Sequence, residues 1–424
     1  MLRVSRVLAP VAVGTLSIFG CAIHTNFQGP GNTTVTVNGK NMTTTVGKNE
    51  ATETVQKRFL AAQVGSVSAD TERGNIEVRA ATDRSSEIQV QATKSIHGDD
   101  PEETLKTLLP SVSVSAELKG TALVLTSDYP EEYKKKNVSV AVHYLITVPS
   151  RLGVDLKTSS GDIKLNGVQG GAKVSTEYGS IDVRGAAGTL EVETSSGAIT
   201  IADAAGANKI SAKTRYGNIS IERAGGEIEA ETNSGSITVS DVHSATGLTL
   251  KSEYGNVELT NAAGKIHATT NSGQVKVNEA TVIDSLTLHS DYGNVEANAI
   301  VGVGGASLLK VELTTSSGSV FYSGEASDLT LKSAYGGVSG KLTGKIGLKS
   351  ANVTSSSGSA ELTLPQNISA TVRTATASGQ VDVPGGLVCT NSNEDGTDKT
   401  VLVGGGAAKV KISSEYGNAT FHQE

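Results

Sequence analysis

Apolar and polar residues alternate in short segments along most of the chain, and each pair of segments flanks a glycine. Before Gly161 the apolar positions are Val154 and Leu156, and after it they are Ile163 and Leu165. The same four offsets recur around the later glycines of the series. Alternation with a period of two on both sides of a turn predicts two strands, each with one buried face.

The turn between these segments is itself a repeat, which reads Thr or Ser, any residue, Ser or Tyr, then Gly. Its spacing is 18 or 20 residues in the first eight copies and looser afterwards. A period of this length predicts an all-β fold, a β-solenoid (β-helix) of roughly 18–20-residue strand–turn–strand units. A tight bend favours glycine at positive φ, which we expect at these turns. The turn glycines are Gly161, Gly179, Gly197, Gly217, Gly235, Gly255, Gly273, Gly293, Gly318, Gly336, Gly358, Gly379 and Gly417.

The residue before the turn glycine alternates between Ser and Tyr. Tyr178, Tyr216, Tyr254 and Tyr292 follow one another at intervals of 38 residues. If one unit forms one rung of the solenoid, Tyr and Ser alternate along one edge; if two units form a rung, the tyrosines make a ladder of their own. These four tyrosines are a candidate ligand-facing edge, where rings can stack on a glycan. The alternative is that they pack on neighbouring rungs.

The start of the chain has the pattern of an export signal. Arg3 and Arg6 precede an apolar stretch, residues 7–19, that is too short to span a bilayer as a helix. Ile18 and Gly20 before Cys21 resemble the lipobox of bacterial lipoproteins. We therefore predict a lipoprotein signal peptide over residues 1–20.

A lipidated Cys21 would anchor the chain to a membrane, because two or more acyl chains hold a protein stably where one does not. The residue after it is Ala22 rather than Asp, which is similar to outer-membrane sorting. The alternative is a soluble secreted protein in which Cys21 is incidental. Residues 21–55, rich in Thr, Asn and Gly, are predicted to be the lipidated cysteine and a flexible tether.

Two further segments complete the predicted domain organisation. Residues 56–150 are predicted to form a β-rich capping module that covers the first rung, with one helix between Asp99 and Pro110. Residues 151–424 are predicted to form the β-solenoid repeats with a C-terminal cap.

The charge of the chain argues against nucleic-acid binding, and its cysteine content argues against a disulfide framework. The net charge is −7, and the only basic run, Lys134–Lys136, follows two glutamates, so we interpret it as a solvated loop and predict no nucleic-acid partner. Cys389 is the only cysteine besides Cys21. With Cys21 lipidated it has no partner, so it is interpreted as an unpaired structural thiol.

The residues of a catalytic or metal site are not recognisable in the sequence. β-Helix enzymes that act on polysaccharides need carboxylates clustered on adjacent rungs. Asp162 and Asp182 follow turn glycines, but the equivalent places in other units are Ala198, Asn218 and Ser236 or outward Thr and Ser. The seven histidines are scattered, without metal-ligand spacing. We therefore predict no catalytic residues, no metal and no cofactor.

The repeat units T-x-[SY]-G-[DSN]-[IV]-x-[IVL], together with Val148-Pro149 and the last unit, Ser414–Asn418, resemble a bacterial putative-adhesin family of unknown function, also called adhesin-like β-helix. The resemblance covers roughly residues 56–424 and transfers no catalytic residue. It implies a binding role at the cell envelope.

These observations together favour a non-enzymatic, lipid-anchored, adhesin-like binding protein of the cell envelope. Its predicted partners are the membrane, through the lipid, and a glycan or an envelope or surface protein. The expected location is the outer membrane. Two alternatives are a structural or assembly accessory of the envelope and a carbohydrate-active β-helix enzyme.

Overall fold

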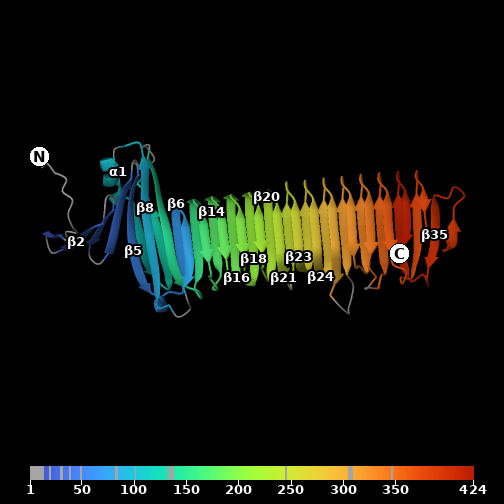
Figure 1. Ribbon diagram of the computed structural model, residues 1–424, viewed down its shortest axis with the longest axis horizontal. Coiled ribbons are helices and arrows are strands. Elements are labelled where there is room, and N and C mark those ends of the chain that lie inside the picture. The colour runs from blue at the N-terminus through green and yellow to red at the C-terminus, as the bar shows by residue number, and fades with distance from the viewer. Residues whose placement is uncertain are drawn as a thin grey trace. The chain divides into compact units, whose positions relative to one another are not determined.

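The computed structural model describes the backbone of residues 14–18, 21–28, 32–37, 40–47 and 102–103. It describes whole residues over 50–81, 85–100, 104–130, 133, 138–243, 246–303, 309–344 and 347–424. The chain divides into two compact units, Met1–Asp182 and Val183–Glu424. Nearly all of the described elements are strands, which confirms the all-β prediction (Figure 1).

The first unit begins with antiparallel strands that pair in the order β1, β2, β3, β4, β5, β8 and β11. Leu105 and Leu109 are buried beneath the short helix α1 and the turn that follows it. The bounds are β1 (Gly14–Ile18), β2 (Cys21–Gln28), β3 (Asn32–Val37), β4 (Lys40–Gly47), β5 (Glu50–Leu60), β6 (Ser66–Arg73), β7 (Ile76–Ala81), β8 (Glu87–Gly98), α1 (Glu102–Leu108), β9 (Ser113–Lys119), β10 (Ala122–Asp128), β11 (Val138–Pro149), β12 (Gly153–Ser160), β13 (Ile163–Asn166), β14 (Ala172–Tyr178) and β15 (Ile181–Arg184), the last crossing the division between the units.

The predicted leader and tether overlap the first of these strands. Strand β5 begins at Glu50, inside the segment predicted as a tether, and its Ala51 is fully buried. Most of the predicted signal peptide and the side chain of Cys21 lie outside the described residues. The signal peptide, the lipid and the tether therefore stay predictions.

Parallel pairing in the first unit does not follow chain order. We call one pass of the chain through two consecutive strands a rung. The first strands of successive rungs pair in one parallel ladder, and the second strands pair in another. The rung β6–β7 pairs on one side with β12 and β13 and on the other with β10 and β11. Residues 66–81 thus lie between residues 122–149 and residues 153–166. The predicted boundary at residue 150 falls inside this unit because β12 and β13 pair with the strands before it.

The second unit is a stack of such rungs. Its strands are β16 (Ala187–Ser196), β17 (Ile199–Ala202), β18 (Gly206–Tyr216), β19 (Ile219–Glu222), β20 (Glu227–Ser234), β21 (Ile237–His243), β22 (Leu248–Ser252), β23 (Val257–Thr270), β24 (Val275–Ser290), β25 (Val295–Gly302), β26 (Lys310–Thr315), β27 (Val320–Gly324), β28 (Asp328–Ser333), β29 (Val338–Leu342), β30 (Ser350–Ser355), β31 (Ala360–Leu364), β32 (Ala370–Thr376), β33 (Val381–Asp382), β34 (Val388–Ser392), β35 (Asp398–Val403), β36 (Ala408–Ser414) and β37 (Ala419–Gln423).

Each repeat unit forms one rung in this stack. Strand β16 pairs with β18 in parallel, with Leu190 opposite Ile210, and β18 pairs with β20, with Ile210 opposite Ile228. The second strands pair in the same way, β17 with β19 and β19 with β21. Of the two arrangements that the sequence left open, the structure has the first, in which Ser turns and Tyr turns alternate along one edge.

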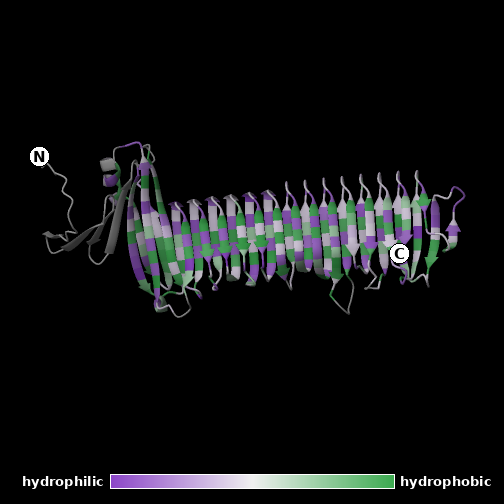
Figure 2. Cartoon of the chain, in the orientation of Figure 1, coloured by the Kyte–Doolittle hydropathy of each residue, from purple (hydrophilic) through white to green (hydrophobic). Residues whose placement is uncertain are grey.

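The core of the second unit is the thin apolar layer between its two ladders. Ile210 and Ala212 of β18 and Ile219 and Ile221 of β19 are almost completely buried, while the residues between them face outward. Figure 2 shows the resulting alternation of hydrophobic and hydrophilic positions along the strands. Burying one isoleucine side chain stabilises the fold by about 1.5–3 kcal/mol.

The C-terminal end of the stack departs from chain order. Strand β36 pairs with β30 on one side and with β32 on the other, and β37 pairs with β31 and β33. The rung of residues 408–423 therefore lies between the rungs of residues 350–364 and residues 370–382. The hairpin β34–β35 pairs antiparallel with β32 and covers that strand.

Candidate functional site

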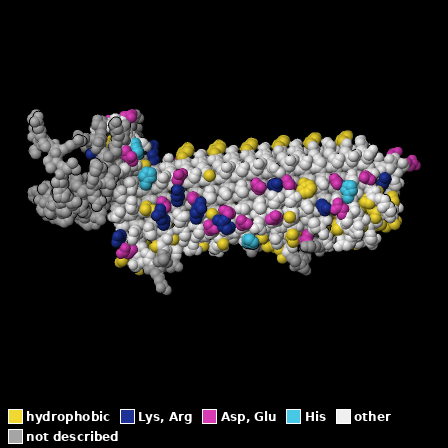
Figure 3. Space-filling model, in the orientation of Figure 1, with side chains coloured by type: hydrophobic (Ala, Val, Ile, Leu, Met, Phe, Trp, Pro, Cys, Tyr) yellow, Lys and Arg dark blue, Asp and Glu magenta, His cyan; other side chains and the backbone are white. Residues whose placement is uncertain are grey.

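Exposed tyrosines follow the turn edge of the second unit. We call this row the tyrosine edge. Each of these residues is 59–73% exposed, and Figure 3 shows hydrophobic side chains at regular intervals along one edge of the array. The row is Tyr216, Tyr254, Tyr292, Tyr335 and Tyr416. Tyr178, the remaining tyrosine of the four that the sequence singled out, lies in the first unit and is 64% exposed. Sequence reasoning left out Tyr335 and Tyr416 because the 38-residue interval is lost after Tyr292.

The exchange of rungs at the C-terminal end keeps the alternation of the edge intact. In chain order the last turns carry Tyr335, Ser357, Ser378 and Tyr416, with two serines in succession. In space, the turn glycine of the Tyr416 rung stacks on that of Ser357, and the glycine of the Ser378 rung stacks on that of Tyr416. The spatial order is thus Tyr335, Ser357, Tyr416, Ser378, so a tyrosine occupies every second rung to the end.

Backbone hydrogen bonds between neighbouring turns hold the edge rigid. The N–H of Tyr254 donates to the carbonyl of Asn233 at 2.8 Å, and the N–H of Tyr292 donates to that of Asn271 at 2.9 Å. On the rung between them, the N–H of Ser272 donates to the carbonyl of Glu253, which lies in the Tyr254 turn, at 2.9 Å. Stacked strands lie about 4.8 Å apart, so successive tyrosines are about 9.6 Å apart and the five span about 38 Å.

The turn glycines are required by close stacking rather than by a left-handed backbone. A Cβ atom on Gly235 would lie 1.9 Å from the carbonyl oxygen of Gly217, and one on Gly255 would lie 2.0 Å from that of Gly235. The expectation of positive φ is wrong for Gly235 and Gly255, whose backbone conformation lies outside the left-handed region. Within the repeats, it holds for Gly161 of the first unit (φ 156°), at the margin of that region.

A ladder of buried hydroxyl groups ties each turn to the one below it. The side-chain hydroxyl of Thr232 donates to the carbonyl of Gly217 at 3.0 Å, and that of Thr270 donates to Gly255 at 2.8 Å. The same bond is made by Thr158, Thr176, Thr214, Ser252, Ser290, Thr315, Ser333, Ser355, Thr376 and Ser414.

Asparagines that follow tyrosine turns add a bond to the rung above. The side-chain oxygen of Asn256 accepts the N–H of Gln274 at 2.9 Å, and Asn218, Asn294 and Asn418 do the same on their rungs. Sequence reasoning missed both the buried hydroxyl ladder and these asparagine bonds. The recurrence of Thr or Ser three residues before the turn glycine, and of Asn directly after Tyr-Gly, would have indicated them.

A sequence model of the family described as Toastrack DUF4097 matches residues 184–301 and 297–421, which together make up more than half of the chain. The chain belongs to the Toastrack family. This agrees with the family of unknown function that the repeat units resemble. A search of curated proteins found no match to the chain.

Three solved structures are similar to this Toastrack chain at low identity. A putative cell adhesion protein from Clostridium sporogenes ATCC 15579 is 9% identical with a TM-score of 0.18, over 87% of this chain and 99% of that one. A putative adhesin from Bacteroides fragilis NCTC 9343 is 15% identical with a TM-score of 0.25, over 61% and 96%. A putative adhesin from Parabacteroides distasonis ATCC 8503 is 12% identical with a TM-score of 0.30, over 63% and 95%.

The other edge of the Toastrack array, where each second strand ends, is polar and locally strained. Asp203, Arg223, Asp241 and Asn261 have φ between 50° and 57°, a conformation that costs a non-glycine residue free energy. Their side chains offset part of this by bonding between rungs, Arg223 to Asp203 and Asn261 to Asp241, each at 2.6 Å. The hydrogen bond from Arg223 lowers the pKa of the Asp203 carboxyl below its ordinary value. Among the described residues, this edge carries no row of exposed aromatic side chains.

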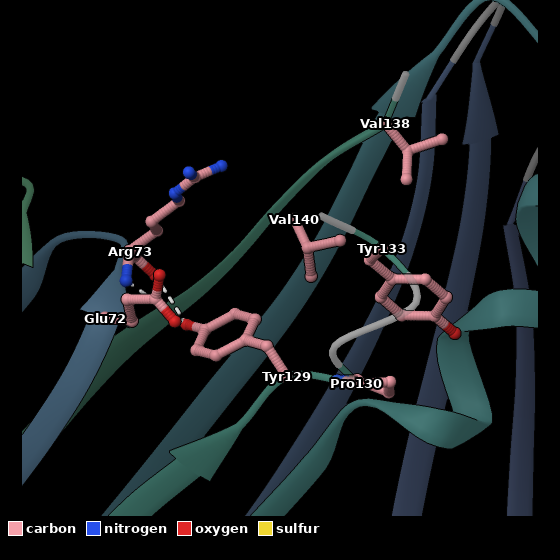
Figure 4. A pocket seen from close by; sticks show the side chains of 7 residues that line it. All are labelled: Glu72, Arg73, Tyr129, Pro130, Tyr133, Val138 and Val140. Carbon is pink, nitrogen blue, oxygen red and sulfur yellow. Dashed lines mark hydrogen bonds between the residues drawn. The ribbon is translucent and has the colours of Figure 1, made fainter. Parts of the chain in front are cut away.

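The first unit of the Toastrack chain contains a cavity of about 170 Å³, lined by Glu72, Arg73, Tyr129, Pro130, Tyr133, Val138 and Val140 (Figure 4). The hydroxyl of Tyr129 donates to the backbone carbonyl of Arg73 at 2.8 Å, and that of Tyr133 donates to the carbonyl of Leu108 at 2.7 Å. Sites for drug-sized ligands measure about 300–1,000 Å³. The cavity is smaller, and both hydroxyl groups are already engaged within the fold.

Cys389 is exposed on β34. Within the described ranges, no group of three His, Cys, Asp or Glu side chains is arranged to hold a metal ion. Over the same ranges, no helix combines the length and apolar character needed to cross a bilayer.

Proposed function

We propose that this protein is a non-enzymatic, adhesin-like binding protein of the bacterial cell envelope, and that the tyrosine edge contacts its ligand. The observation that carries the proposal is the row of five exposed tyrosines, one on every second rung of the second unit. Single exposed hydrophobic residues need no explanation. Five exposed rings in register along one edge are not randomly scattered, and this regularity supports an interaction surface. Tyrosine suits such a surface because it offers a rigid ring and a polar hydroxyl.

The competing explanation is that the tyrosines only pack on their neighbours. Packing would bury the ring faces, as it does for Tyr322, whose side chain is fully buried in the same unit. The edge tyrosines keep between 59 and 73% of their surface exposed. Contacts between rungs therefore account for the minor part of each ring.

The binding proposal is tested by retention of the purified full chain, carrying Cys21→Ser to prevent lipidation, on an array of glycans, peptidoglycan fragments and matrix proteins. We expect selective, saturable retention that is lost in the double variant Tyr254→Ala/Tyr292→Ala. Phe321→Ala is the matched control, because Phe321 is an exposed aromatic residue on a strand rather than on the tyrosine edge. Absence of retention on every ligand, or retention that the tyrosine variant does not change, would refute the proposal.

We further propose that Cys21 carries the lipid that anchors the protein, at the outer membrane. The support is the apolar leader after Arg3 and Arg6 and the lipobox-like residues before the cysteine. Cells grown with a clickable fatty acid should label the protein, and Cys21→Ser should abolish the label and release the protein from the membrane fraction. A label that persists in the variant would contradict the anchor.

A further inference from the structure

The tyrosine edge has a fixed repeat that restricts what can bind along it. Each repeat contains one exposed ring and one small polar turn, such as Ser234 or Ser272. The backbone ladder sets the repeat at two rungs, about 9.6 Å. A ligand that meets all five rings must be straight for about 38 Å, eight rung spacings, and must present a similar repeat.

The fixed period extends past the point where the sequence loses it. Tyr416 comes 81 residues after Tyr335, but the rung of residues 408–423 is inserted two places after the rung of Tyr335. Stacking in chain order would leave two Ser turns together and a gap in the row. The observed order gives five equally spaced rings.

The charges beside the rings restrict the ligand further. The residues directly before the five tyrosines are Arg215, Glu253, Asp291, Ala334 and Glu415, and thus three acids and one base. An acidic edge repels nucleic acids and phosphate-rich polymers. Carboxylates accept hydrogen bonds from hydroxyl groups, which suits a neutral ligand that is rich in them.

We infer that the tyrosine edge binds an extended, uncharged β-1,4-linked polysaccharide that lies along the stack of rungs. Such a chain is straight, and its disaccharide repeat is close in length to two rungs. The flat, CH-rich faces of its sugar rings can stack on aromatic rings. Its equatorial hydroxyl groups lie at the rim of each sugar, where they can donate to carboxylates such as those of Glu253 and Glu415. An α-1,4-linked glucan coils and cannot follow the row. This inference rests on the proposed function, in which the edge is the ligand contact.

The inference is tested with the full chain and soluble cello- and chito-oligosaccharides of two to ten sugars, by calorimetry. We expect affinity to rise with each added disaccharide, because each one meets another ring. Tyr254→Ala should weaken binding of the longest oligosaccharide about 2- to 10-fold, the range for one stacked ring, and Tyr254→Phe should retain it. The decisive variant is Tyr254→Ser/Ser272→Tyr, which keeps the number of rings but moves one of them by a rung. It should bind as weakly as Tyr254→Ala.

Several results would overturn the inference. One is no binding by the unmodified chain, a measurement that does not depend on the folding of any variant. Others are equal affinity for malto-oligosaccharides of the same length, or full affinity in the variant with the displaced ring. If the array experiment instead finds tyrosine-dependent retention on a protein or an α-linked glycan, the proposed function stands and this inference fails.

Discussion

The turn glycines leave no room for a side chain between neighbouring rungs, and Gly255→Ala tests the importance of this close stacking. A Cβ atom on Gly255 would lie 2.0 Å from the carbonyl oxygen of Gly235 and 2.5 Å from its carbonyl carbon. Carbon contacts are favourable at about 3.5–4.0 Å, so the two turns would have to separate by more than about 1 Å. The φ angle of Gly255 is outside the left-handed region, so alanine brings no dihedral strain and the effect is steric.

The separation would break the bonds that join the two turns. The hydroxyl of Ser252 donates to Gly235 at 2.9 Å, the N–H of Tyr254 to Asn233 at 2.8 Å, and the N–H of Ile237 to Asn256 at 2.9 Å. Each contributes about 1 kcal/mol net, so losing the three costs about 3 kcal/mol. Asn256→Ala removes one side-chain bond at an exposed position and should cost less, about 1 kcal/mol.

The matched control is Gly385→Ala. No atom lies within 4 Å of a Cβ built on Gly385, and its φ is also outside the left-handed region. Alanine there should be neutral or stabilise by up to about 1 kcal/mol. Because a repeat array need not unfold in one step, the assay is amide hydrogen exchange resolved by peptide, with thermal unfolding beside it. Equal protection of β20–β23 in the Gly255 and Gly385 variants would refute the close stacking of the turns.

Substitutions at three further positions test other parts of the fold. Thr232→Val keeps the shape of a fully buried side chain but leaves the carbonyl of the rung below unbonded; it should cost about 1–3 kcal/mol in chemical denaturation, and Thr232→Ser should not. Burial lowers the pKa of His143, whose Nδ1 accepts the N–H of Asn75 at 3.1 Å, so this contribution to stability should be full above about pH 6.5 and lost as the pH falls through the lower folded value. His143→Asn keeps an acceptor without the titration, and a pH–stability curve as steep as that of the unmodified chain would contradict this. Lys94→Met should cost about 3–5 kcal/mol by leaving the buried carboxylate of Glu53, 3.3 Å from Lys94, without its cation, and a melting temperature equal to that of the unmodified chain would count against it.

The repeat made the local fold predictable but not the order of its parts. Strand positions and turn glycines follow from alternation and spacing, and the motif placed Tyr254 at a turn but left open whether its ring is exposed or packed on neighbouring rungs. The insertion of the Tyr416 rung before the Ser378 rung did not follow from the repeat, because parallel ladders pair backbone groups that every unit offers alike. The order depends on how the chain between β33 and β36 folds into a hairpin on β32, and that segment lacks the repeat.

The candidate site was predictable in part for the same reason. The motif pointed to the tyrosines, and only the stacking gave their number and spacing. The hydroxyl of Thr232 could have been found from the recurrence of Thr or Ser at its place. The cavity beside Tyr129 could not, since most of its lining, from Tyr129 to Val140, comes from segments that lack the period of the repeat.

The alternation of Ser and Tyr turns also governs how an array of this kind can change its length. Gain or loss of one rung would bring two like turns together and shift every later ring out of phase. Gain or loss of two rungs, such as the 38 residues from Tyr216 to Tyr254, would change the row by one tyrosine and leave both ends as they are. Duplication of a gene segment that encodes such a pair would therefore extend the reach of the surface in steps of about 9.6 Å without redesign of the remainder.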